Sequence, residues 1–258
     1  MIVENSNRRS KDNSEIEPIL EINNLKKRFG TNQVLNGFNL KLKEGENLVI
    51  MGKSGSGKSV MIKCLIGLIE PDSGSIKVMG QEITTLNQTQ FDKLRNEIGF
   101  LFQGSALYDS MTVRENLEFP LRHHKERFGK NINTLELVEE ALTNVGLLHA
   151  IDLMPSELSG GMKRRIALAR TLILKPKIIL YDEPTSGLDP ITSKEIIELM
   201  RNIQKQYKTS SLIITHDVDC ARVIANRMIL LIDGINYIEG NYEILEKSSD
   251  EKVKAFFK

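Results

Sequence analysis

The sequence has few cysteines, and neither belongs to a recognisable disulfide or metal-binding pattern. Cys64 and Cys220 are the only two among 258 residues, and no CxxC spacing or pair of ligand-spaced histidines accompanies them. Two isolated cysteines cannot build the disulfide framework of a small secreted protein. We therefore expect both thiols to be core residues of a protein in a reducing cytosol.

Long apolar runs and an excess of one charge are also missing. The longest stretches without a charged side chain, such as residues 98–108, have 11 residues, whereas a membrane-spanning helix needs about 20 apolar ones. Lys and Arg number 35 and Asp and Glu number 34, which leaves a net charge of +1. Because the overall field is weak, we expect no nucleic-acid partner, and any contact with an anionic membrane must be local.

The composition is that of an ordinary folded protein. Hydrophobic residues make up 40% and charged residues 27% of the chain, close to globular averages, and at about 150 residues per domain the length fits one large domain with a modest insertion. Residues 1–17 are rich in Asn, Ser and alternating charge, so we predict a loose tail there. The folded domain is expected at residues 18–240. Residues 241–258 form a C-terminal extension whose helically spaced Val253, Phe256 and Phe257 can dock a neighbouring subunit or fold back on their own domain.

Two kinds of strand pattern indicate an α/β fold. Residues 19–29, 33–42 and 74–80 are short alternating or β-branched segments separated by turn residues, which predicts a small antiparallel layer. Uniformly apolar runs then recur with helical patterns between several of them, as is typical of parallel strands covered on both faces. These runs are residues 47–51, 98–102, 178–181, 212–215 and 228–232. Residues 104–158 contain no such run and are predicted to be a helical insertion.

Four of the apolar runs end directly in polar residues. They are followed by the loop that starts at Gly52, by Gln103, by the pair Asp182 and Glu183, and by His216. Ligands of open parallel sheets bind outside the carboxyl ends of the strands. We therefore expect these groups to converge on one edge of the sheet.

Residues 52–59, GKSGSGKS, fit the phosphate-loop pattern between a predicted strand and a predicted helix. Glycines let backbone N–H groups curl around phosphate oxygens, and the helix N-terminus adds partial positive charge. In such a loop Lys58 reaches the β- and γ-phosphates and Ser59 ligates magnesium. A flexible surface turn is the structural alternative.

Asp182 and Glu183 stand at the end of a predicted buried strand. There Asp182 can hold magnesium through water and Glu183 can polarise the attacking water. At an isolated strand end, capping of the next helix would be an equally good interpretation. The phosphate loop elsewhere in the chain favours catalysis.

The segment LSGGMKRRIALAR, residues 158–170, starts a helix against the usual charge preference. Ser159 can cap it, but Lys163, Arg164 and Arg165 crowd its positive end, where acidic residues are normal. We interpret this helix start as a site for an anion such as a nucleotide phosphate. On this segment alone, a solvated basic face is an equally good interpretation. Met162, Ile166, Ala169 and Ile173 form an ordinary apolar stripe on the same helix.

Three further residues are ambiguous when each is considered alone. His216 can be a structural histidine or can hydrogen-bond a γ-phosphate as a neutral imidazole. Gln103 can both donate and accept, which suits a side chain that senses magnesium or water. Phe29 can be core or a plate against a base. His123 and His124 lack partner ligands and are predicted to be surface residues.

Together these motifs resemble the ATP-binding-cassette (ABC) ATPases over about residues 18–240. The phosphate loop, Gln103, LSGGM, IILYDE, SGLD and His216 occur in the family's order. The resemblance implies an α/β fold of the P-loop NTPase (RecA-like) type, with a mostly parallel core sheet, an N-terminal antiparallel β subdomain and an inserted helical subdomain at about residues 104–158. It also implies hydrolysis of ATP with Mg²⁺.

The same resemblance assigns roles to individual residues. Catalytic roles fall to Glu183, His216, Gln103 and Lys58, and metal binding to Ser59, Gln103 and Asp182. The resemblance also implies that Phe29 stacks on adenine and that the phosphate loop binds the nucleotide through Gly52, Lys53, Ser54, Gly55, Ser56, Gly57, Lys58, Ser59 and Val60. Ser159, Gly160 and Gly161 are implied to bind the γ-phosphate of the partner subunit's ATP. Asp189 is implied to communicate across the dimer.

A closer similarity connects residues 99–124 and 158–170 with the ATPase subunit of Mla-type (MCE-protein) phospholipid transport systems. Met162 replaces the commonest signature Gln, and Val60 follows Ser59 where many cassettes have Thr. This resemblance implies a homodimer at the cytoplasmic face of the inner membrane, bound peripherally to an integral membrane permease, with a possible MCE-domain substrate-binding protein in the complex. Import of small solutes, release of lipoproteins and, less favoured, a soluble ABC ATPase acting on nucleic acid or ribosomes are the alternatives.

Overall fold

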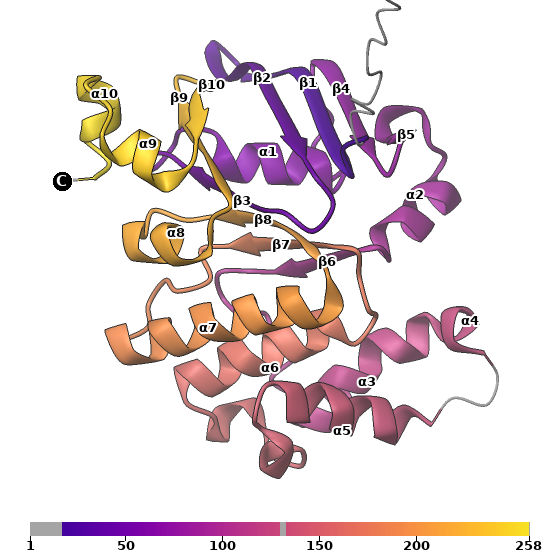
Figure 1. The fold of residues 1–258 in the computed structure, drawn as a ribbon. Coiled ribbons are helices and arrows are strands. Elements are labelled where there is room, and N and C mark those ends of the chain that lie inside the picture. The colour runs from indigo at the N-terminus through magenta and orange to yellow at the C-terminus, as the bar shows by residue number, and fades with distance from the viewer. Residues whose placement is uncertain (1–16, 130–132, 258) are drawn as a thin grey trace, which may run out of the picture.

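The computed structural model describes residues 17–129 and 133–257 of the chain. Of the predicted N-terminal tail, all but Glu17 lies outside the described residues. Two sheets and their covering helices make up the body of the molecule (Figure 1). None of the helices in the described ranges is both long enough and apolar enough to cross a membrane.

The first sheet is antiparallel and has the order β2-β1-β4-β5. Its three longer strands coincide with the three alternating segments, which confirms the predicted antiparallel layer. Alternation arises because one face of this sheet is buried while the other is exposed. The strands are β1 (Leu20–Phe29), β2 (Asn32–Leu42), β4 (Ser73–Val78) and β5 (Gln81–Glu82).

The second sheet has the order β10-β9-β3-β8-β7-β6. It is parallel except at one edge, where β10 pairs with β9 in the antiparallel direction. All five uniformly apolar runs form its parallel strands. The edge strand β10 is only partly buried, so its sequence INYIEG lacks the apolar run that marked the others. The strands are β3 (Asn47–Met51), β6 (Ile98–Leu101), β7 (Ile178–Asp182), β8 (Ser210–Ile214), β9 (Arg227–Ile232) and β10 (Ile235–Gly240).

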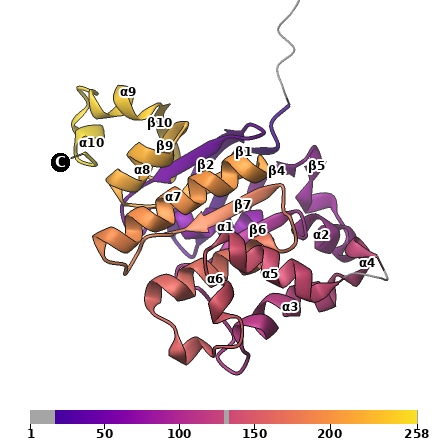
Figure 2. The ribbon, with the colours of Figure 1, turned by 60° about the horizontal axis from the view of Figure 1, so that its bottom comes forward.

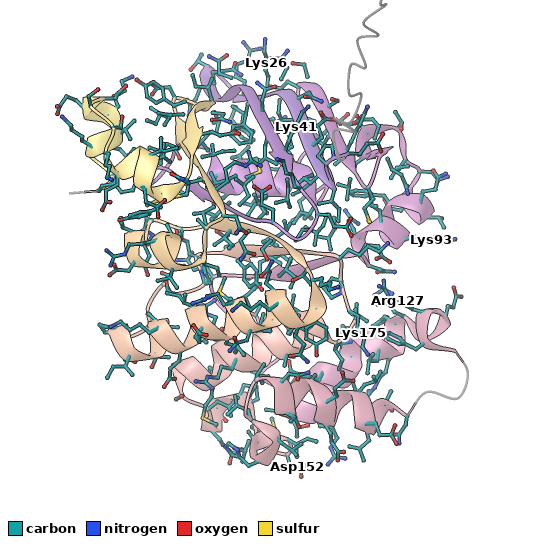
Figure 3. The ribbon with its side chains drawn as sticks, in the orientation of Figure 1. Lys26, Lys41, Lys93, Arg127, Asp152 and Lys175 are labelled. Carbon is teal, nitrogen blue, oxygen red and sulfur yellow. The ribbon has the colours of Figure 1, made fainter. Side chains whose placement is uncertain are left out.

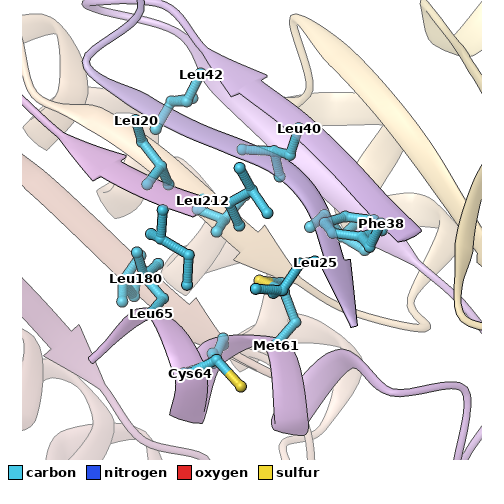
Figure 4. Close-up of a cluster of buried hydrophobic side chains, with 14 of the residues drawn as sticks. Leu20, Leu25, Phe38, Leu40, Leu42, Met61, Cys64, Leu65, Leu180 and Leu212 are labelled. Atoms are coloured by element: carbon cyan, nitrogen blue, oxygen red, sulfur yellow. The ribbon is translucent and has the colours of Figure 1, made fainter. Parts of the chain in front are cut away.

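Helices cover both faces of the second sheet, and this explains why its strands are apolar throughout. On one face α1 (Lys58–Leu65) lies between the two sheets, where Met61 and Leu65 pack with Leu25, Phe38 and Leu212 (Figure 4). The other face is covered by α6 (Gly160–Leu172), α7 (Pro190–Tyr207) and α8 (Val218–Ile224). Outside these layers, α2 (Gln88–Arg95) precedes β6.

Both cysteines lie in these layers. Cys64 and Cys220 are buried and unpaired, as predicted. Burial raises the pKa of the Cys64 thiol to about 11 and that of the Cys220 thiol to about 12. Neither thiol is a reactive nucleophile at neutral pH, since the thiolate is the reactive form.

Between β6 and α6 the described residues form helices and no strand. They are α3 (Val113–His123), α4 (Lys125–Phe128), α5 (Thr134–Asn144) and two single 3₁₀ turns, Leu148–Ala150 and Pro155–Glu157. This group lies beside the main sheet (Figure 2) and has a core of its own. Arg127 pairs with Glu97 at 2.9 Å and donates to the Lys175 carbonyl at 3.3 Å, which connects α4 to the segments before β6 and β7 (Figure 3).

Helix α6 belongs to both cores. Ile166, Ala169 and Ile173 pack in the helical core, with Met162 against it, which confirms the predicted apolar stripe. Ala167 and Leu168 pack under the main sheet instead. A displacement of α6 is therefore felt in both parts of the molecule.

The C-terminal extension folds back on its own domain. It contains α9 (Tyr242–Glu246) and α10 (Glu251–Lys254), and Val253 is fully buried. The Phe257 ring contacts the Tyr242 ring edge-on at a centroid distance of 5.5 Å, and the Tyr237 hydroxyl donates to Asp250 at 2.7 Å. Of the two arrangements left open by the sequence, this structure contains the intramolecular one.

Candidate active site

One cavity of about 770 Å³ lies at the carboxyl ends of the parallel strands. The phosphate loop, Gln103, Asp182, Glu183 and His216 all line it, so the polar ends of four strands do meet at one edge. Phe29 lines it from β1, and Ala255 and Phe256 reach it from the C-terminal extension. The remaining lining residues include Val34, Met51, Gly52, Lys53, Ser54, Gly55, Gly57, Lys58, Ser59, Val60 and Ile214.

The phosphate loop has the backbone of an anion-binding nest. Gly55 and Gly57 have φ values of 79° and 106°, in the left-handed region that glycine tolerates. Helix α1 then begins at Lys58 without a side-chain cap and without an acidic residue in its first turn. Its first N–H groups thus remain available to an anion. Ser56 lines the adjoining hollow, and its hydroxyl is buried with no partner among the described residues.

Lys58 is folded back over this loop. Its ammonium donates to the Gly52 carbonyl at 2.6 Å and to the Lys53 carbonyl at 3.0 Å. Burial lowers the pKa of Lys58, while Glu183 and Asp182 partly oppose that shift. A phosphate would offer this half-buried ammonium a charged acceptor in place of neutral carbonyls.

Asp182 ends β7 in an environment that disfavours its negative charge. Burial raises the pKa of this carboxyl, and the neighbouring carboxylate of Glu183 raises it further. A cation in the cavity would stabilise the charged carboxylate and oppose both effects, as the Lys58 ammonium does in part. With the Ser59 hydroxyl and the Gln103 amide oxygen in the same cavity, the donors are hard oxygen atoms of the kind that Mg²⁺ prefers, with phosphates and water completing the shell. The residues present therefore fit magnesium bound together with a nucleotide.

Glu183 is held in an uncommon backbone conformation. Its φ is 50°, which is rare for a residue with a side chain. The Glu183 N–H donates to the Ile214 carbonyl at 2.8 Å, and Glu183 Oε2 lies 2.8 Å from His216 Nδ1. Glu183 is 13% exposed and His216 is 71% exposed. The strained turn thus places a nearly buried carboxylate at the cavity wall, beside an exposed imidazole.

The next helix does not use these acids as caps. Asp189 caps α7, because its carboxylate accepts hydrogen bonds from the Ile191 and Thr192 N–H groups at 3.0 Å. This removes the alternative interpretation of Asp182 and Glu183. Gln103 meanwhile donates to the Ser186 hydroxyl at 3.2 Å, so it touches the segment that follows Glu183.

The LSGG segment lies away from this cavity. Ser159 caps α6, with its hydroxyl accepting from the Met162 N–H at 3.2 Å, and Ser159 and Gly160 are exposed. Gly161 lies so close to α7 that a Cβ there would approach Thr192 Cγ2 to 2.6 Å. These residues, with Asp189, are not among those that line the cavity of their own chain.

Two of the three basic residues near the start of α6 have partners within their own chain. Arg164 is buried and donates to backbone carbonyls, and Arg165 pairs with Glu195 at 2.6 Å. Both side chains are already engaged within the chain. Charge counting along the sequence could not reveal this, because it does not show on which face of a helix each residue falls.

Phe29 lines the cavity together with residues that the sequence pattern did not indicate. Phe29 is 47% exposed, with the Lys27 ammonium 5.5 Å from its ring centroid. Phe256 and Val34 were not predicted to line the cavity. The helical spacing of Val253, Phe256 and Phe257 was the available signal, but the pattern alone does not say where a terminal helix docks. His123 contacts Phe119, with centroids 4.6 Å apart, and no group of three or more potential metal ligands occurs within the described ranges.

Fold and site together define a P-loop nucleoside triphosphatase. The ABC transporter family model matches residues 35–186. The chain belongs to the ABC transporter family, as the ATP-binding cassette ATPase whose motifs its sequence carries. This confirms the recognised family, the fold class, the ATPase activity and the use of ATP with Mg²⁺.

Individual relatives have different names. The methionine import ATP-binding protein MetN of Clostridium tetani is 43% identical over 216 residues, which cover 84% of this chain and 67% of MetN. The probable ribonucleotide transport ATP-binding protein mkl of Mycobacterium tuberculosis is 38% identical over 237 residues, which cover 92% of this chain and 66% of mkl. The chain spans about two thirds of the length of these relatives. The ATP-binding cassette MJ0796, solved as a dimer in a post-hydrolysis state with ADP and Pi, superposes with a TM-score of 0.77 at 32% identity, covering 86% of this chain and 98% of that one.

Proposed function

We propose that this ATPase energises phospholipid transport through an integral membrane permease of the Mla/MCE type. In this proposal two copies of the chain bind peripherally at the cytoplasmic face of the inner membrane, and an MCE-domain protein handles the lipid. The supporting observation is an aromatic groove that is lined mostly by residues 99–124, a segment that resembles Mla-type ATPases.

Each catalytic role follows from a position in the cavity. Lys58, released from its two loop carbonyls, binds the β- and γ-phosphates, and backbone N–H groups of the loop bind their oxygens. Ser59, Asp182 and Gln103 hold Mg²⁺, which neutralises phosphate charge when bound. Glu183 orients and polarises the attacking water, and His216 hydrogen-bonds the γ-phosphate.

The signature residues require a second copy of the chain. Ser159 and Gly160 are exposed at the start of α6 and do not line the cavity of their own chain. A partner chain that presents this helix start to the γ-phosphate would complete each site. ATP would then hold two copies together, and loss of the γ-phosphate would release them.

A second hollow beside the ATP cavity provides a docking surface for the permease. This groove is lined by aromatic and apolar side chains, among them Phe100, Phe102, Tyr108, Phe119 and Pro120. The Tyr108 and Phe119 rings lie 4.8 Å apart, and the rings of Phe100 and Phe102 lie 4.0 Å apart, edge to face. Such a groove suits the apolar face of a short helix.

The groove adjoins the ATP cavity through consecutive residues. Phe102 lines the groove and Gln103 lines the cavity. A helix that moves Phe102 thus moves Gln103. Permease position and nucleotide state are coupled by one peptide unit in this proposal.

Methionine import is the second candidate, and the 43% identity to MetN favours it. Every catalytic residue would be the same in both systems, so only the permease and its cargo separate them. The lipid assignment rests on residues 99–124, which form most of the groove, and on Met162, which packs against the helical core where many cassettes carry the signature Gln.

Replacing Phe119 with Glu should abolish permease binding while leaving the ATPase intact. A carboxylate in the groove must be desolvated against apolar surface, which is unfavourable without a partner. We expect at least about tenfold less permease to co-purify from solubilised membranes, because loss of one buried aromatic contact at an interface typically costs about 2 kcal/mol or more of binding free energy. ATP hydrolysis by the isolated chain should stay within about twofold of wild type. The matched control is Ile244→Glu, at an exposed apolar residue outside the groove.

The co-purified complex also decides the cargo. Reconstituted into vesicles, it should move a fluorescent phospholipid in the presence of ATP and should not accumulate methionine. Methionine uptake without lipid movement would support the second candidate. Unchanged co-purification of the Phe119→Glu variant would contradict the docking surface.

A further inference from the structure

Arg164 is an arginine of the second turn of α6 and is only 3% exposed. One of its terminal nitrogens donates to the Phe102 carbonyl at 2.7 Å and the other to the Ser186 carbonyl at 3.3 Å. Its Nε is buried without a partner among the described residues. The guanidinium thus holds two loops that reach the active site from different strands.

Both loops end on groups of the ATP cavity. The Phe102 carbonyl belongs to the peptide that leads into Gln103. The Ser186 N–H donates to the Glu183 carbonyl at 3.2 Å, and the Ser186 hydroxyl accepts from Gln103 at 3.2 Å. Arg164, Gln103 and Ser186 therefore form a closed set of contacts around the turn that carries Glu183.

A general stabilising role does not account for this burial. Burial alone lowers the pKa of Arg164, and within the described part of the chain no carboxylate opposes that shift. Neutral carbonyls compensate a desolvated guanidinium incompletely, and an apolar side chain of similar volume would fit such a site at lower cost. The guanidinium carries donors on two terminal nitrogens, and these bridge two separate backbone segments. An apolar side chain cannot make such a bridge.

We propose that Arg164 is a positioning residue for hydrolysis, which fixes Gln103 and the turn after Glu183 relative to the signature helix. Its side chain donates to backbone carbonyls and is not among those that line the ATP cavity. The same helix that presents Ser159 to the partner's ATP also carries Arg164 in its second turn. Through Arg164 this helix is hydrogen-bonded to the two loops that complete the chain's own site. The inference rests on the proposed roles of Gln103 and Glu183 and is independent of the transported substrate.

Substituting Arg164 with Gln or Met should lower kcat and leave KM nearly unchanged. We expect kcat to fall about 10- to 100-fold, as for other losses of preorganisation, and KM for ATP to stay within about threefold, because neither loop carries the phosphate cradle or Phe29. Arg164→Lys, which keeps the charge but lacks the fork, should give an intermediate kcat. In hydrogen exchange, amides of residues 103–106 and 184–188 should exchange faster while those of residues 52–59 do not.

The control is Arg95→Gln. Arg95 also donates to a backbone carbonyl, that of Ile66, through its Nε and one terminal nitrogen, and neither residue is among those that line the ATP cavity. This variant should keep the wild-type kcat. If folded Arg164 variants keep kcat, or if kcat, KM and exchange change throughout the domain, the positioning role is overturned. If Glu183→Gln hydrolyses ATP normally, the proposed catalytic roles have failed instead. Should the Gln and Met variants not fold, an Arg164→Lys variant with wild-type kcat is sufficient to overturn the inference.

Discussion

Replacing Lys58 with alanine should reduce ATP turnover by about 100-fold or more and weaken ATP binding. The ammonium is the positively charged group placed directly over the phosphate loop, where it donates to the Gly52 and Lys53 carbonyls. It is half-buried, with a pKa lowered by that burial, so its attraction for phosphate is little screened by water. Loss of one preorganised donor in such a site typically costs about 10²- to 10³-fold in rate.

The Lys58 prediction is checked by steady-state phosphate release and by titration with a fluorescent ATP analogue. Thermal unfolding without nucleotide should remain within a few degrees of wild type, because the two hydrogen bonds lost are to neutral carbonyls and each such bond typically contributes about 1 kcal/mol. Lys93→Ala is the control, since Lys93 is an exposed lysine of α2 that is not among the residues lining the cavity. Wild-type turnover in Lys58→Ala would remove the phosphate-loop assignment.

Replacing Glu183 with glutamine should separate binding from hydrolysis. The amide has the size of the carboxylate and keeps an acceptor for the His216 contact, so the turn with φ 50° should survive. The negative charge that polarises water is lost, and we expect about a 100-fold or larger fall in turnover. ATP should bind at least as tightly, since one carboxylate near the γ-phosphate is neutralised.

Single-turnover hydrolysis and equilibrium ATP binding on the same Glu183→Gln preparation test this separation. Glu198→Gln, on the exposed side of α7, should behave as wild type in both assays. A Glu183→Gln variant that turns over normally would show that another group activates the water.

The sequence predicted most of the parallel sheet because burial on both faces forces a strand to be apolar at every position. Residues 47–51 and 178–181 carry that pattern and form β3 and β7. The same physics explains the miss at β10, an edge strand with one partner and no full burial. Convergence of the polar residues was predictable because parallel strands all end at one edge.

Side-chain direction could not be predicted in the same way. Arg164 and Arg165 are adjacent in sequence, yet one is buried under two loops and the other pairs with Glu195. Phe256 reaches the cavity because α10 folds back, and this depends on where the terminal helix finds an apolar surface. Cargo selection is similarly hidden, since relatives named for methionine and for ribonucleotide transport are 43% and 38% identical to this chain.

The most direct test of a site shared between two copies is the mass of Glu183→Gln in solution. The chain has a mass of 29.2 kDa, and light scattering should show twice this value with ATP and Mg²⁺ and the single value with ADP. Adding Ser159→Arg should prevent the increase while leaving ATP bound to its own chain, because Ser159 is exposed and away from that chain's cavity. If Glu183→Gln binds one ATP per chain and keeps the single mass, the composite site is contradicted.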